Sequence, residues 1–86
     1  MSDVLQLAVT GKIKDARNKM IELIKVYGMS ESDFLKYINQ ALFAMKTEHL
    51  EDLSQIIAKY DYRILSGSNP EIQLTAMLAE LSKFSK

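Results

Sequence analysis

Cysteine is absent from this sequence, and histidine, proline and glycine are scarce, with one, one and three copies. Without cysteine the chain forms no disulfide, offers no thiolate to a metal and has no thiol nucleophile. A single histidine excludes a multi-histidine metal cluster. No apolar run approaches the roughly 20 residues that cross a bilayer, and no signal-peptide pattern opens the chain. We therefore expect a soluble, intracellular domain that binds no metal and contacts no membrane.

An excess of charge of either sign is also lacking, because 11 Lys and Arg residues balance 11 Asp and Glu residues. No overall field therefore attracts phosphate backbones or anionic lipids. The lysines between residues 12 and 25 are interrupted by Asp15 and Glu22, which is typical of a solvated mixed face. We expect no direct nucleic-acid site in this chain.

Motifs for catalysis are missing as well. The patterns GxxxxGK(S/T), GxGxxG and HExxH do not occur, so the common phosphate-cradling and zinc-hydrolase motifs are excluded. His49 lies among Glu48, Glu51 and Asp52, but no nucleophile stands at a spacing that would place it beside the ring. A solvated histidine is the better interpretation. We predict no catalytic, cofactor-binding or metal-binding residue, and no enzymatic activity.

Most of the apolar residues that are present recur at helical spacing. The β-branched residues never follow the alternating pattern of a half-buried strand, and breaks fall at residues 10–11, 28, 44–47 and 66–70. The pattern predicts an all-α fold, a compact bundle of four to five short-linked helices in a single domain over residues 1–86. The helices are expected over residues 3–9, 12–27, 30–45, 47–66 and 70–84.

Residues that favour helix ends stand at these breaks. Side chains that accept a hydrogen bond from the first turn are predicted N-caps, and glycine after the last turn suits a left-handed C-terminal cap. The three middle helices each carry one apolar stripe that we expect to be buried. The predicted N-caps are Ser2, Ser30 with Asp33, Thr47, and Asn69 followed by Pro70 and Glu71, and the predicted ends are Gly28 and Gly67. The stripes are Ile13, Ala16, Met20, Leu23, Ile24 and Tyr27; Phe34, Leu35, Ile38, Ala41, Leu42 and Met45; and Leu50, Leu53, Ile57, Tyr60 and Ile64.

The last helix differs, because apolar residues fall on both of its sides. An all-round apolar helix is normally covered from two directions, and a chain of this length has little mass with which to do so. The helix therefore predicts a protein partner, and Tyr37 and Phe43 add apolar surface outside the stripe of their own helix. One side of the helix carries Leu74, Met77, Leu78, Leu81 and Phe84, and the opposite side carries Ile72, Ala76 and Ala79.

Three blocks of the sequence resemble one known family. Residues 61–81 look like its closing motif, D-(F/Y)-R-(L/I)-x-E-G-A-N-x-x-I-Q-L-x-A-x-L-A-x-L. Residues 8–17 are similar to A-L-x-G-x-F-x-x-A-R, and residues 27–33 resemble Y-G-L-S-x-x-D. The family is the small subunit of replication factor C, the clamp loader of archaeal and eukaryotic replication. The matched residues include Gly11, Ala16, Arg17, Gly28, Asp61, Arg63, Gly67, Asn69 and Gln73.

Four positions depart from this family pattern. Ser66 and Ser68 replace the usual Glu and Ala, Asn39 stands where many members have His, and Glu31 where many have Gly. These positions lie at helix ends or on a polar face, so the expected fold is unaffected. A divergent archaeal subunit and a paralogue are both compatible with the departures.

The resemblance implies the collar of a clamp loader. In this family two N-terminal ATPase domains precede a helical domain, and five helical domains form a ring. The ring holds the ATPase domains around primer-template DNA while the complex loads the sliding clamp with ATP. We accordingly expect residues 1–86 to be the C-terminal piece of a larger ATPase subunit, with no cofactor of its own. Its location would be cytoplasmic in an archaeon or nuclear in a eukaryote.

The partners implied are the homologous small subunits and the large subunit of the same complex. A head-to-tail contact requires two different patches on each copy, and the final helix with the Tyr37–Phe43 region could supply them. The predicted interface residues are Tyr37, Phe43, Met77 and Phe84, whereas Leu74, Leu78 and Leu81 are expected in the core. The alternative is a helical protein-interaction module of another clamp-loader-like ATPase.

Overall fold

Residues 3–84 are described by the structure, a computed structural model, and every regular element in this range is a helix. The all-α prediction is confirmed. Among the described helices, none combines the length and the apolar content that a bilayer crossing needs. The elements are α1 (Val4–Val9), α2 (Ile13–Ile21), the π-helical turn η1 (Glu22–Val26), α3 (Glu31–Ala44), α4 (Leu50–Leu65), α5 (Pro70–Leu81) and the 3₁₀ turn η2 (Ser82–Phe84).

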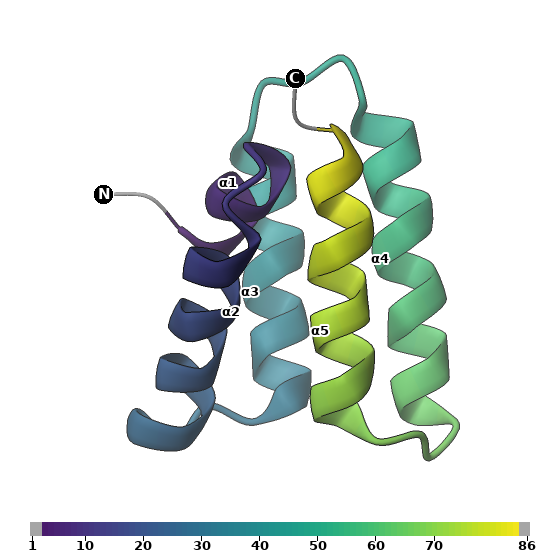
Figure 1. Cartoon of the computed structure of the whole chain (residues 1–86). Helices are drawn as coiled ribbons and strands as arrows, with labels where there is room; N and C mark the ends of the chain where they lie inside the picture. Colours follow the sequence, from purple (N-terminus) through teal and green to yellow (C-terminus); the bar gives the residue numbers. More distant parts are fainter. Residues whose placement is uncertain (1–2, 85–86) are drawn as a thin grey trace.

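Figure 1 shows α2, α3, α4 and α5 side by side as a bundle, with the short α1 near its upper end. Helix α5 packs between α2 and α4, α3 packs against α4, and α1 contacts α2, α3 and α5. The seam between α2 and α5 and the seam between α3 and α4 therefore lie on opposite edges of the bundle. We call the end that carries the α2–α3 and α4–α5 connections the lower end (Figure 1).

Helix starts follow the capping chemistry of the sequence in most cases. The side chain of Ser30 accepts a hydrogen bond from the Asp33 N–H at 3.0 Å, and Asn69 accepts one from the Ile72 N–H at 3.1 Å, so both predicted caps are confirmed. In α1 the cap is Asp3, whose Oδ1 lies 2.7 Å from the Gln6 nitrogen. The predicted cap Ser2 lies outside the described residues.

The predicted start of α4 is wrong. The helix begins at Leu50, three residues after the predicted cap Thr47. The Thr47 hydroxyl instead accepts a hydrogen bond from the His49 N–H at 3.1 Å, which closes a short turn before the helix. A threonine hydroxyl accepts a backbone hydrogen bond in a turn as readily as at a helix start, and Thr47 does so in the turn.

The second helix changes its geometry before it ends. In η1 the Tyr27 N–H donates to the Glu22 carbonyl five residues earlier, at 3.2 Å, so the turn is wider than an α-turn. The wider turn shifts the phase of the following side chains, and Tyr27 is 71% exposed. The prediction that Tyr27 completes the buried stripe is therefore wrong. Gly28 follows with φ of +75°, which confirms the predicted left-handed end.

One apolar core joins all the main helices. The stripes predicted for α3 and α4 are confirmed at their centres, and no polar or charged residue in the described range is buried. The inner side of α5 contributes four side chains with no exposed surface. Full burial of such a side chain stabilises the fold by about 1.5–3 kcal/mol. These central residues are Phe34, Leu35, Ile38, Leu42, Leu53, Ile57, Tyr60, Leu74, Met77, Leu78 and Leu81.

Candidate protein–protein interface

Large apolar side chains remain exposed after this core is formed. Within residues 3–84 six of them are at least 65% exposed. Five belong to η1 and its end, the last turn of α4 and the first turn of α5, which all lie at the lower end (Figure 1). Only Phe43 belongs to the upper half, near the end of α3. The six are Val26, Tyr27, Phe43, Tyr62, Leu65 and Ile72.

A groove with an apolar lining lies between α2 and α5. It encloses about 410 Å³, and its α5 wall is formed by the side of the helix that faces away from the core. Ile72 is 65% exposed there, Ala79 is exposed and Ala76 is half-buried. The sequence analysis placed apolar residues on this side of the final helix, and the structure leaves the side outside the core, although none of the predicted interface residues lies on it. The groove is lined by Arg17, Glu71, Ile72, Thr75, Ala76 and Ala79.

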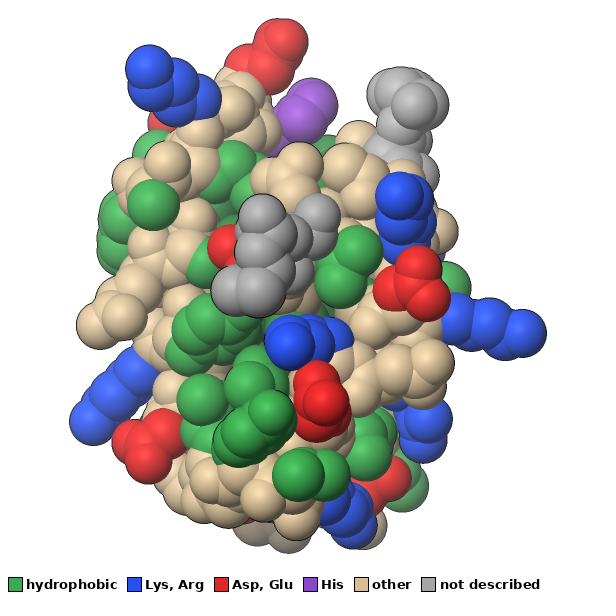
Figure 2. Space-filling model, turned by 90° about the vertical axis from the view of Figure 1, so that its left-hand side faces the viewer, with side chains coloured by type: hydrophobic (Ala, Val, Ile, Leu, Met, Phe, Trp, Pro, Cys, Tyr) green, Lys and Arg blue, Asp and Glu red, His purple; other side chains and the backbone are tan. Residues whose placement is uncertain are grey.

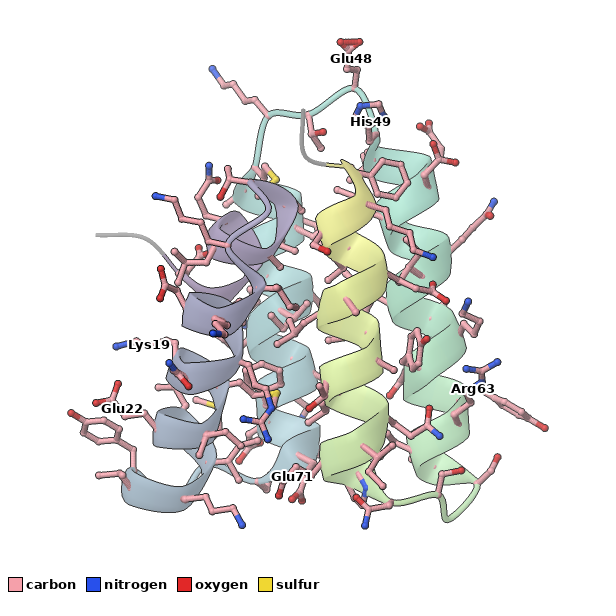
Figure 3. All side chains as sticks on the ribbon, viewed as in Figure 1. Lys19, Glu22, Glu48, His49, Arg63 and Glu71 are labelled. Atoms are coloured by element: carbon pink, nitrogen blue, oxygen red, sulfur yellow. The ribbon has the colours of Figure 1, made fainter. Side chains whose placement is uncertain are left out.

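Charges stand at the rim of this groove. Arg17 Nη2 lies 3.8 Å from Glu71 Oε2, and Lys25 Nζ lies 3.4 Å from Glu71 Oε1. Figure 3 shows Glu71 at the start of α5, on the side of the bundle where α2 runs. Arg17 and Lys25 thus share one carboxylate, and Glu31 lines the adjoining hollow together with Lys25 and Glu71, so the charges of this region balance.

A second hollow lies on the opposite edge, between α3 and α4, and encloses about 240 Å³. Phe43 stands on its wall and is 77% exposed. The half-buried Asp61 lines it too, and no ion pair to this carboxylate forms within residues 3–84. This carboxylate is therefore available to a cation from another molecule. The hollow is lined by Asn39, Leu42, Phe43, Ser54, Ile57, Ala58 and Asp61.

The four predicted interface residues have different surroundings, and the structure does not bring them together. Phe43 is freely exposed. Tyr37 is half-buried, its hydroxyl accepts a hydrogen bond from the Val4 N–H at 3.3 Å, and its ring centre lies 6.0 Å from that of Phe34. Phe84 is half-buried, with its ring centre 5.1 Å from that of His49.

Met77 requires a correction. Its side chain has no exposed surface and belongs to the apolar core. It points inward with Leu74 and Leu81, so it offers nothing to a neighbouring molecule. Met77 is a core residue, and we do not propose it as part of an interface.

The sequence analysis did not single out Tyr62 and Leu65, two of the exposed apolar side chains at the lower end. Tyr62 and Leu65 lie beside the stripe Leu53–Ile64 of α4 rather than in it, so helical phase alone could have found them. Arg63, whose guanidinium carbon lies 5.1 Å from the centre of the Tyr60 ring, points away from the bundle in Figure 3. Val26 likewise lies outside the predicted stripe of the second helix, so helical phase identifies it too.

The family-motif residues divide into structural and surface roles. Ala16 is fully buried, Asn69 caps α5, and Gly28 and Gly67 have φ of +75° and +95° in open surroundings. Only the backbone conformation requires glycine at those two positions. Gly11 also has positive φ, and Gln73 is half-buried. Arg17 lines the α2–α5 groove, and Asp61 lines the α3–α4 hollow on the opposite edge.

A polar cluster joins α4 to α5 away from the groove. Lys59 Nζ lies 2.7 Å from Glu80 Oε1, and the Tyr60 hydroxyl donates to the same oxygen at 3.1 Å. The hydrogen bond from Lys59 lowers the pKa of Glu80. Burial, followed by the hydrogen bond to Glu80, raises the pKa of Tyr60. The cluster links α4 to α5.

Charges on the α2 side are mixed rather than of one sign. Figure 2 views this face and shows acidic and basic side chains interspersed with hydrophobic ones. Lys19 and Glu22 form one such pair at 3.3 Å. Within residues 3–84, no three acidic or histidine side chains come close enough to hold a metal ion. The α2 face therefore carries charges of both signs without an excess that the view of Figure 2 makes plain.

Comparison with known proteins gives a consistent result. The model of the family described as the replication factor C C-terminal domain matches residues 1–80. The chain is 37% identical over 84 residues to the replication factor C small subunit of Sulfolobus acidocaldarius, covering 93% of this chain and 26% of that protein. It is 35% identical over 81 residues to the small subunit of Methanocella arvoryzae, covering 92% and 25%. The chain spans about a quarter of the length of these curated relatives.

Proposed function

Since the chain belongs to the replication factor C C-terminal domain family, we propose that it acts as the collar of a clamp-loader small subunit. In this role the helical domain binds its counterparts on neighbouring subunits and closes them into a five-membered ring. The complete subunits, with their ATPase domains, would then load a sliding clamp onto primed DNA with ATP. The partners are the other small subunits and the large subunit of the complex.

One observation carries the proposal: two apolar hollows remain uncovered on opposite edges of a domain that matches this family. A ring of subunits needs two different contact patches per copy, because each copy has one neighbour on either side. The α2–α5 groove and the α3–α4 hollow with Phe43 meet that requirement. Large uncovered apolar surface is typical of protein contacts.

We place no chemistry in this chain. The family match is to the C-terminal domain, and the sequence has no phosphate-binding loop. The ATPase activity and the contacts with clamp and DNA would belong to the remaining three quarters of the subunit. Archaeal relatives favour the cytoplasm of an archaeon as its location.

The proposal is tested by the association of the chain itself. Sedimentation equilibrium between about 10 µM and 1 mM covers the range in which transient interfaces bind. We expect the average mass to rise above the 9.8 kDa of one chain as concentration increases. A mass of one chain throughout this range would contradict the proposal. Circular dichroism of the same samples checks that the helices are formed.

A further inference from the structure

We infer that copies of this chain associate head to tail, with Phe43 of one copy in the α2–α5 groove of the next and Asp61 facing Arg17. The inference rests on the proposed function, because it identifies the surfaces that make the collar contact. It commits to a second copy of this chain as the occupant of the groove.

The groove offers an open, shallow apolar surface to an incoming apolar side chain. Ile72 forms one wall, and the short side chains of Ala76 and Ala79 leave the surface of α5 open to close approach. About 410 Å³ is available, and most of the lining is apolar. Aromatic side chains bury more apolar area than other residues, so one inserted ring displaces much of the water that covers this surface.

Phe43 is the side chain best placed to enter such a groove. It is the most exposed large apolar residue in the described range, at 77%, and it stands alone at the upper half of the bundle. The hollow beside it would receive the flank of the neighbouring molecule. A single aromatic anchor that enters a pocket is the usual centre of a protein interface.

Charge complementarity favours the same pairing. At the groove rim Arg17 shares the Glu71 carboxylate with Lys25, and the 3.8 Å pair of Arg17 with Glu71 is the longer of the two. The α3–α4 hollow carries Asp61, to which no cation is bound within residues 3–84. Arg17 of one copy would therefore compensate Asp61 of the next, and complementary charges of this kind fix the orientation of a contact.

The position of the two surfaces determines the kind of assembly. They lie on opposite edges of the bundle, with α5 on one and α3 on the other (Figure 1). The contact is therefore heterologous, and each copy keeps a free Phe43 at one side and a free groove at the other. Such contacts close into rings when the rotation between copies allows it.

A mixing experiment tests this geometry. Phe43→Asp removes the anchor, and Ala79→Gln fills the groove with a longer neutral side chain on an exposed position. Each variant alone should associate at least about tenfold more weakly than the parent chain, as truncation of an interface anchor does. An equimolar mixture should form a 1:1 dimer by sedimentation and native mass spectrometry. It should not grow further, because only one intact Phe43 and one intact groove can meet.

The matched control is Tyr27→Asp, which places the same residue at an aromatic side chain of similar exposure outside both surfaces. Its association should equal that of the parent chain within about twofold, and circular dichroism must show all three variants folded. If the parent associates while either variant associates equally well, or if the mixture gives no dimer, the inference is wrong and the proposed function stands. If the parent never associates, both fail.

A neutral pair of variants tests the polar contact separately. Asp61→Asn and Arg17→Gln should each weaken association by about three- to tenfold, because charge pairs across interfaces contribute at this level. The double variant should be no weaker than the weaker single variant. Losses that multiply in the double variant would show that the two side chains act independently, and would overturn the assigned pairing.

Discussion

Both faces of α5 carry apolar residues, but the two faces have opposite surroundings. On the inner face Leu74, Met77, Leu78 and Leu81 have no exposed surface, whereas on the outer face Ile72 is 65% exposed. The inner face meets the core that α1, α3 and α4 share, and the outer face meets only the edge of α2 and the groove. Apolar residues on a helix face therefore predict that the face is buried. They do not show whether the same chain or another molecule packs against it.

The inner face should dominate the stability of the domain. Replacing Met77 with Ala leaves a cavity in a fully buried site, and such changes reduce the free energy of unfolding by about 2–5 kcal/mol. Urea denaturation followed by circular dichroism measures the loss. A loss below about 0.5 kcal/mol together with weaker self-association would contradict the core assignment and return Met77 to the interface.

The N-terminal cap of α5 stabilises the first turn of the helix that carries both faces. Asn69→Ala removes the hydrogen bond to the Ile72 N–H, which should reduce the free energy of unfolding by about 1 kcal/mol. Thermal and urea denaturation measure this loss. Asn69→Ser is the matched control, because serine retains a capping oxygen and should recover most of the stability. Equal losses for both variants would show that the cap hydrogen bond is unimportant here.

The polar cluster at Glu80 should give a smaller and pH-dependent effect. The pKa of Glu80 is lowered in the folded chain, so its contribution is present above the pKa of the unfolded chain and is lost as pH falls through the folded pKa. Lys59 is partly exposed, which limits the contribution to about 0.5–1 kcal/mol. Glu80→Gln should therefore destabilise the domain at neutral pH and have less effect in acid. An identical effect at both pH values would exclude an ionic origin.

The outer face should give the smallest effect on stability and a clear effect on association. Ile72→Ala changes an exposed side chain, so we expect the free energy of unfolding to change by less than about 0.5 kcal/mol. Self-association should nevertheless weaken, since Ile72 forms a wall of the groove. Denaturation and sedimentation of one preparation measure both quantities. A large loss of stability would remove the distinction between the two faces.

Much of this fold was predictable from local chemistry. Stripes at helical spacing identified the centres of α3 and α4, and Ser30 and Asn69 identified two helix starts correctly. The failures have local causes that spacing does not reveal. A π-turn moved Tyr27 into solvent, and a short turn used the hydroxyl of Thr47 that was predicted to cap α4.

The candidate site was less predictable than the fold. The sequence pattern correctly divided the last helix into two apolar sides. It did not show which of the two sides would remain exposed once α2 and α4 pack against the helix. As a result Met77 was wrongly assigned to the interface. Arg17 and Glu71 are distant in sequence and meet only because α2 and α5 pack together. Phe43 was predictable, because it lies opposite the buried stripe of its own helix.

The central claim is that the outer face of α5 and the Phe43 surface bind each other. Backbone amide chemical shifts of the folded chain, recorded in a dilution series, test it most directly. We predict concentration-dependent shifts in two clusters, one around residues 72–79 with Arg17 and one around Phe43 and Asp61. Shifts confined to the lower end, at Tyr27 and Leu65, would contradict the claim.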